Sequence, residues 1–201
     1  MLNIRECPQC GAPLSKNLYK CEYCKAEVFI TSISYLSNYD NSQIQKYIKY
    51  YKELIQNNPD DDKGYLGLGL CYLQLSMFPL SQKNLAKAME LAPENASVYY
   101  YYSLSLIAGQ RIRSLSFDTV ENLVMYLNTA INMEQNNGLF LFLMMLIKHD
   151  FYILNGLREP EPTYKTLFQN LNGVKIDDEE LNRLKVCVKV ADFEELINGL
   201  S

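Results

Sequence analysis

Residues 65–93, YLGLGLCYLQLSMFPLSQKNLAKAMELAP, decide the fold. Large apolar and small residues recur along this stretch three or four positions apart, which is the spacing of one face of a helix. The positions that carry the pattern are Tyr65, Leu68, Gly69, Tyr72, Ser81, Leu85, Ala88 and Pro93. The pattern predicts helices over this stretch.

The same residue types at the same spacing resemble the tetratricopeptide (TPR) repeat. The resemblance implies that Gly69 lies where the first helix approaches the second, and Ala88 where the second helix meets the next repeat. Pro93 would end the unit, because a proline cannot continue a helix. Ser81 stands where the family usually has alanine. We therefore expect a mostly α fold built as a TPR-like antiparallel helical-repeat array.

Neighbouring segments extend the array on both sides. Pro59 lies 34 residues before Pro93, and residues 43–57 fit the second helix of a degenerate preceding unit. In the following unit, about eight extra residues fall within 109–117, and Asp118 with Glu121 predicts a capping box that restarts the helix. Residues 138–155 fit the first helix of a further unit. The TPR-like region is thus 42–157, with a plain helical bundle as the alternative.

Residues 158–201 are expected to form capping helices. A turn is predicted over 158–162 and a helix over 163–171, and Asp177 begins a helix that runs through Leu184, Val188 and Ala191. The preceding segment 139–147 is apolar on every side, so it must be covered all round. Either the closing helices cover it, or a partner or second copy does, which leaves a homo-oligomer through this helix open.

The N-terminus carries two CxxC pairs. Cys7-Pro-Gln-Cys10 and Cys21-Glu-Tyr-Cys24 are separated by ten residues. Both thiolates of one CxxC turn can approach a single ion, and four thiolates match the tetrahedral preference of zinc. A unit of about 30 residues is too small to fold on its own core and usually needs a metal or disulfide.

The two pairs, with Gly11 after the first, resemble the zinc ribbon family, in which a β-hairpin carries the metal ligands. Lys25 stands where the family often has glycine after the second pair. We predict a zinc ribbon over residues 1–30 and a linker over 31–41, with one structural Zn²⁺ per chain, because a Cys₄ shell has no open position for catalysis. Redox-active CxxC pairs and unrelated buried cysteines are the alternatives; Cys71 and Cys187 are predicted to be core residues.

Charge and hydropathy argue against two classes of protein, those that bind nucleic acid and those that cross a membrane. The formal net charge is −4 and the isoelectric point is about 5.1, which argues against binding nucleic acid through its phosphates. The N-terminus lacks a signal pattern, and the longest apolar run, 139–147, is far shorter than the roughly 20 residues that cross a bilayer. We expect a cytoplasmic protein without membrane insertion, in which cysteines bind metal or are buried rather than form disulfides.

The TPR resemblance implies a groove lined by the first helix of each repeat, which holds a peptide or a partner helix. The residues expected to line it are Lys63, Leu66, Leu70, Leu73, Ser97, Tyr100, Tyr101, Leu104 and Ile107. Leu66 and Leu70 occupy the positions where chaperone-binding members clamp a C-terminal carboxylate, so that clamp is not expected. The alternative is that this apolar surface is core, filled by the protein's own C-terminal helices.

An enzyme is not expected. His149 is the single histidine, and no recognisable catalytic motif accompanies it. The leading hypothesis is a non-catalytic adaptor that binds a protein or peptide partner. One alternative is a nucleic-acid-associated zinc ribbon protein; another is a regulatory subunit of a separate enzyme. The nucleic-acid alternative would use a basic, aromatic face of Arg5, Lys16, Tyr19, Lys20, Tyr23 and Lys25.

Overall fold

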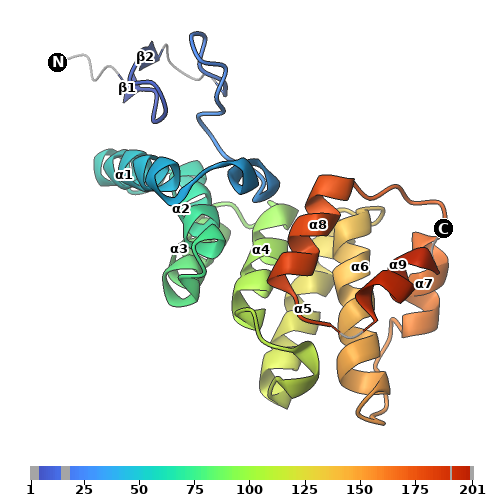
Figure 1. Ribbon diagram of the computed structural model, residues 1–201. Helices are drawn as coiled ribbons and strands as arrows, with labels where there is room; N and C mark the ends of the chain where they lie inside the picture. Colours follow the sequence, from blue (N-terminus) through green and yellow to red (C-terminus); the bar gives the residue numbers. More distant parts are fainter. Residues whose placement is uncertain (1–4, 15–18, 191, 200–201) are drawn as a thin grey trace. The chain divides into compact units, whose positions relative to one another are not determined.

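The computed structural model describes residues 5–14, 19–190 and 192–199. The chain is mostly helical and forms two compact units, Met1–Pro93 and Glu94–Ser201 (Figure 1). In the described part of the chain, no helix combines the length and the apolar composition that a membrane crossing needs.

The first unit begins with two small hairpins. Strands β1 (Arg5–Glu6) and β2 (Pro13–Leu14) pair antiparallel around the first CxxC turn. Around the second turn, a single antiparallel bridge joins Lys20 to Glu27. We call the described residues of these hairpins, 5–14 and 19–30, the cysteine module.

Residues 31–41, predicted as a linker, contain the 3-10 helix η1 (Ser34–Asn38), in which Leu36 is buried. Helix α1 (Asn41–Asn57) follows, and Asp40 and Gln43 form a reciprocal capping box at its start. Its buried residues recur every three or four positions: Ile44, Tyr47, Ile48, Tyr51 and Leu54. This face packs toward the rest of the unit.

Helices α2 (Asp62–Gln74) and α3 (Phe78–Leu91) form the closely packed pair that the sequence predicts. A Cβ atom on Gly69 would lie only 2.5 Å from Leu85 Cγ, so the two helices approach where Gly69 leaves room. Ser81 Oγ donates a hydrogen bond to the Gly69 carbonyl at 2.8 Å. The Ser81 hydroxyl thus contributes to the contact between the two helices.

The second unit is helical. It contains α4 (Ala96–Ile107), the 3-10 helix η2 (Ile112–Ser114), α5 (Phe117–Met133), α6 (Gly138–Ile147), the π-helix η3 (Lys148–Ile153), α7 (Tyr164–Leu171), α8 (Asp178–Cys187) and α9 (Phe193–Asn198). The segment that connects α4 to α5 includes η2. Within this segment, the backbone N–H of Arg113 donates to the buried Asp150 carboxylate at 2.8 Å, which joins η2 to η3.

Two predicted helix ends differ from the structure. Ser116, rather than Asp118, caps α5, because the Ser116 hydroxyl accepts the backbone N–H of Thr119. The cap therefore lies two residues before the predicted one. The helix predicted to run through Val188 ends at Cys187, since Val188 is extended and Lys189 pairs with Arg111 in a parallel bridge. Ala191, the last residue predicted for that helix, lies outside the described residues.

Helix α6 is buried on all sides within the second unit. Residues 140–147 are each no more than 3% exposed. Helices α5, α7 and α8 pack against α6, and the rings of Phe142 and Phe193 meet edge to face at 5.5 Å. The closing helices therefore reach this segment, which was the first of the two alternatives for covering it. Oligomerisation through this helix stays a prediction.

Candidate metal centre and its contact with the helices

The two CxxC turns have the same backbone hydrogen bonds. In each, the carbonyl of the first cysteine accepts the N–H of the residue four positions later, and its own N–H donates to the carbonyl five positions later. The bonds are Gly11 to Cys7 (2.9 Å), Lys25 to Cys21 (3.0 Å), Cys7 to Ala12 (2.8 Å) and Cys21 to Ala26 (2.8 Å). Two equivalent turns therefore present two equivalent pairs of sulfur atoms.

Each turn is closed by a residue in the left-handed region. Gly11 has φ of 72°, and Lys25 has φ of 63° at the matching position of the second turn. Glycine adopts this conformation freely, whereas a side chain is strained there. Lys25 thus keeps the turn geometry of a glycine, and its Nζ donates to the Glu22 carbonyl at 2.8 Å.

The four sulfur atoms converge on one point. All four lie within 4.8 Å of one another, and the Cys7–Cys24 and Cys10–Cys21 Sγ distances are both 3.7 Å. A tetrahedral ion with metal–sulfur bonds of about 2.3 Å would hold its ligands about 3.8 Å apart. The cysteines therefore fit a single tetrahedral metal ion.

Backbone amides stabilise negative charge on the two buried sulfurs. The amide of Cys24, followed by that of Tyr23, lowers the pKa of Cys21. Burial raises the pKa of Cys7 and outweighs the opposing effect of the Cys10 and Gln9 amides. Four thiolates so close together require a compensating positive charge, which a divalent ion supplies.

The core of the cysteine module is very small. It consists of buried Cys7, Cys21 and Val28, against which Ala12, Leu14, Phe29 and Tyr50 pack. Such a core removes little apolar surface from water, so a metal would supply much of the stability of this part.

Tyrosine hydroxyls attach the end of the cysteine module to α1. Tyr51, which is completely buried, donates to the Val28 carbonyl at 3.0 Å and accepts the Ile30 N–H at 2.8 Å. Tyr47 donates to the Glu27 carbonyl at 2.6 Å. Backbone groups of residues 27–30 thereby find partners on a helix about 20 positions away in sequence.

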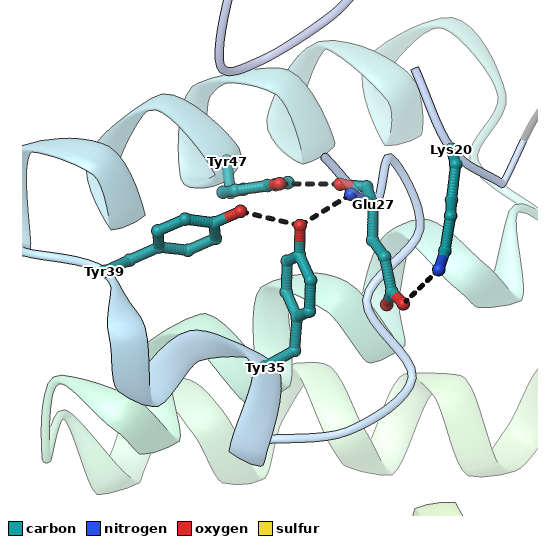
Figure 2. A network of polar contacts seen from close by, with 5 residues as sticks. All are labelled: Lys20, Glu27, Tyr35, Tyr39 and Tyr47. Atoms are coloured by element: carbon teal, nitrogen blue, oxygen red, sulfur yellow. Dashed lines mark hydrogen bonds and ion pairs between the residues drawn. The ribbon is translucent and has the colours of Figure 1, made fainter. Parts of the chain in front are cut away.

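Two further tyrosines come from the segment around η1. Figure 2 shows the Tyr35 hydroxyl accepting hydrogen bonds from the Glu27 N–H and from Tyr39, each at 2.6 Å. The Tyr39 ring stacks on Tyr47 with 5.7 Å between centroids. Glu27 also pairs with Lys20 at 3.8 Å across the second hairpin. We call Tyr35, Tyr39, Tyr47 and Tyr51 the tyrosine clamp.

The tyrosine clamp is a feature that the sequence did not predict. The available indication was the spacing of Tyr47 and Tyr51, four positions apart on one helical face beside apolar residues. A buried tyrosine needs a partner for its hydroxyl, but the sequence does not say which backbone groups provide it.

The residues predicted to bind a partner fall into two groups. Lys63 is exposed, and its Nζ donates to the Tyr19 hydroxyl at 2.9 Å. Among the other predicted positions Ser97 is half-buried, and the rest are buried: Leu66, Leu70, Leu73, Tyr100, Tyr101, Leu104 and Ile107. Burial agrees with the alternative that this stripe is core, and a role in partner binding stays a prediction.

The basic residues of the nucleic-acid alternative are partly engaged within the cysteine module. Lys20 faces Glu27, and Lys25 donates to a backbone carbonyl. Tyr23 and Tyr19 are both exposed, and the Tyr19 hydroxyl accepts a hydrogen bond from Lys63. Arg5 pairs with Leu14 in the first hairpin, and Lys16 lies outside the described residues.

The other two cysteines lie apart from the four-sulfur cluster. Cys71 is fully buried in α2, as predicted for a core residue, and burial raises the pKa of its thiol. Cys187 is partly buried at the end of α8, where burial likewise raises the pKa.

Comparison with known proteins gives no assignment for this arrangement. No protein-family model matches the chain, and no curated protein or solved structure matches it significantly.

Proposed function

We propose that the chain is a non-catalytic adaptor in which a structural zinc ion holds the cysteine module and a TPR-like helical body binds a protein or peptide partner. The observation that carries the proposal is the set of four mutually close sulfur atoms, Cys7, Cys10, Cys21 and Cys24. Four protein ligands complete a tetrahedral shell, so the ion would have no position for substrate or water.

Zinc is the ion that this site suits best. It prefers tetrahedral thiolate coordination, and its binding energy can substitute for the apolar core that the cysteine module lacks. With four thiolates and one Zn²⁺, the formal charge of the chain would become about −6. Such a surface favours partners of opposite charge.

The helical body supports the adaptor role. The α2–α3 pair packs through Gly69 as a TPR unit would, and α4 and α5 form a second pair. Helical pairs of this kind, repeated along a chain, present extended surfaces to protein partners.

Purification of the tagged, zinc-loaded chain from its native cells tests the adaptor role. We expect a protein that co-purifies at fixed stoichiometry and rebinds the purified chain with a measurable dissociation constant. The absence of any such protein, or catalytic turnover by the chain alone, would overturn the proposal.

The nucleic-acid alternative has one supporting observation, the exposed ring of Tyr23 between Lys20 and Lys25. Gel-shift assays over a salt series separate the two functions, because phosphate contacts weaken steeply as salt rises. The adaptor proposal expects no salt-sensitive complex.

A further inference from the structure

A cleft opens beside the cysteine module, next to the α1–α2 loop. It has a volume of about 450 Å³, and the residues that line it include Tyr19, Phe29, Asp60, Asp61 and Asp62. The two rings meet at 65° with 5.9 Å between centroids, so they form an aromatic corner. Acidic groups line the cleft around that corner.

A cation already lies in the aromatic corner. The Lys63 Nζ is 4.9 Å from the Tyr19 ring centroid and 5.7 Å from that of Phe29. Both distances are within the range of attraction between a cation and an aromatic face. The hydrogen bond that the Lys63 Nζ donates to the Tyr19 hydroxyl raises the pKa of Lys63, with smaller contributions from the charges of Asp62 and Asp61. The corner thus favours a positive charge.

Lys63 is held in the corner by one hydrogen bond, from its Nζ to the Tyr19 hydroxyl, and by its contacts with the two rings. Its side chain is exposed, and no ion pair within 4.0 Å engages its Nζ among the described residues. An exposed cation–aromatic contact changes an equilibrium constant by only about two- to fivefold. A competing cation could therefore displace it.

Two of the three carboxylates are available to such a cation. Asp61 is committed, because it caps α2 by accepting the Gly64 N–H at 2.8 Å. In the described part of the chain, neither Asp60 nor Asp62 makes a side-chain hydrogen bond or ion pair, and their charges act on Lys87 and Lys63 only at longer range. An incoming cation would gain these charges in addition to the rings.

We propose that this cleft binds a lysine or arginine side chain of a basic protein partner against Tyr19 and Phe29, and that Lys63 is an internal occupant which the partner's cation displaces. This inference rests on the proposed adaptor function and names the chemistry of the partner. The negative formal charge of the chain agrees with a basic partner.

The direct test is an NMR titration of the full zinc-loaded chain with the peptide acetyl-Gly-Lys-Gly-amide. The matched probe is the same peptide acetylated at Nε, which keeps the aliphatic stem of the side chain and loses the charge. We expect saturable shifts at Tyr19 and Phe29 with the charged peptide alone. Equal responses to both peptides, or no saturable shift at tens of millimolar, would overturn the proposal.

Variants separate displacement from simple charge attraction. Lys63→Met should tighten binding of the charged peptide about two- to fivefold, because it removes the competing cation. Lys52→Met, which changes the net charge equally on α1 away from the cleft, should have a smaller effect. Asp60→Asn combined with Asp62→Asn should weaken binding and flatten its salt dependence. An unchanged dissociation constant in Lys63→Met would contradict the role of Lys63.

The cleft and the adaptor role fail separately. A purified protein partner that binds the Asp60→Asn/Asp62→Asn chain as well as the unaltered chain would leave the adaptor role intact and overturn the cleft. Peptide binding at the cleft without any protein partner would support the cleft and overturn the adaptor role.

Discussion

Replacing Tyr51 by phenylalanine removes a hydroxyl from the contact between α1 and the cysteine module and leaves the ring in place. The ring itself is tightly fitted, since a Cβ on Gly67 would lie 2.3 Å from the Tyr51 ring. The hydroxyl bonds both the Val28 carbonyl and the Ile30 N–H. Phenylalanine should therefore preserve the packing and leave two buried backbone groups without their partner.

The expected loss follows from that burial. An unsatisfied buried polar group costs about 1–3 kcal/mol, so Tyr51→Phe should lower the free energy of unfolding by about that amount or somewhat more. Tyr47→Phe removes one hydrogen bond at the partly buried Glu27 carbonyl and should cost about 0.5–1.5 kcal/mol. The order of the two effects is part of the prediction.

Denaturant unfolding of the zinc-saturated chain, followed by circular dichroism, measures these losses. Tyr23→Phe is the matched control, because Tyr23 is 68% exposed in the same module and should change stability by less than about 0.5 kcal/mol. If Tyr51→Phe were no more destabilising than Tyr23→Phe, the tyrosine clamp would not hold the module on α1.

Three further predictions concern single sites. Lys25→Gly should stabilise the chain by about 1 kcal/mol, because it relieves the strain of a side chain at φ 63° in the left-handed region. Lys25→Ala should give no such gain. Equal unfolding midpoints for Lys25→Gly and the unaltered chain would contradict this prediction. Gly69→Ala should destabilise by about 1–3 kcal/mol in the same assay despite the better helix propensity of alanine, because its Cβ would meet Leu85; a gain in stability would count against the close approach. Burial, followed by the Tyr35 hydrogen bond, raises the pKa of Tyr39 to about 12, so the unfolded chain loses this proton from about pH 10 while the folded chain keeps it. Stability should thus fall between pH 10 and about 12, and Tyr39→Phe should make that fall shallower; an identical pH profile would refute the assignment.

The parts that sequence predicted well depend on local spacing. A CxxC turn brings its two sulfurs together within four residues, and Gly11 marks the left-handed position, so the cluster follows once the two turns meet. The helix pair around Gly69 is similarly local, because a small residue at helical spacing identifies where two helices approach. Residue type alone does not predict every left-handed position, since Lys25 adopts with a side chain the conformation that Gly11 adopts without one.

The parts that sequence did not predict depend on distant partners. Val188 continues a helical pattern, yet its segment is extended because Lys189 pairs with Arg111, far away along the chain. The clamp hydroxyls likewise bond to backbone groups in another element, and backbone groups carry no sequence signature. The aromatic corner around Lys63 combines three segments, so no single stretch indicates it.

We propose that a closed four-thiolate zinc site keeps the cysteine module folded. Anaerobic purification followed by metal analysis and X-ray absorption at the zinc edge tests it most directly. We expect one zinc per chain, bound by four sulfur atoms at about 2.3 Å. Less than about half a zinc per chain, or a shell that includes nitrogen or oxygen ligands, would contradict the claim.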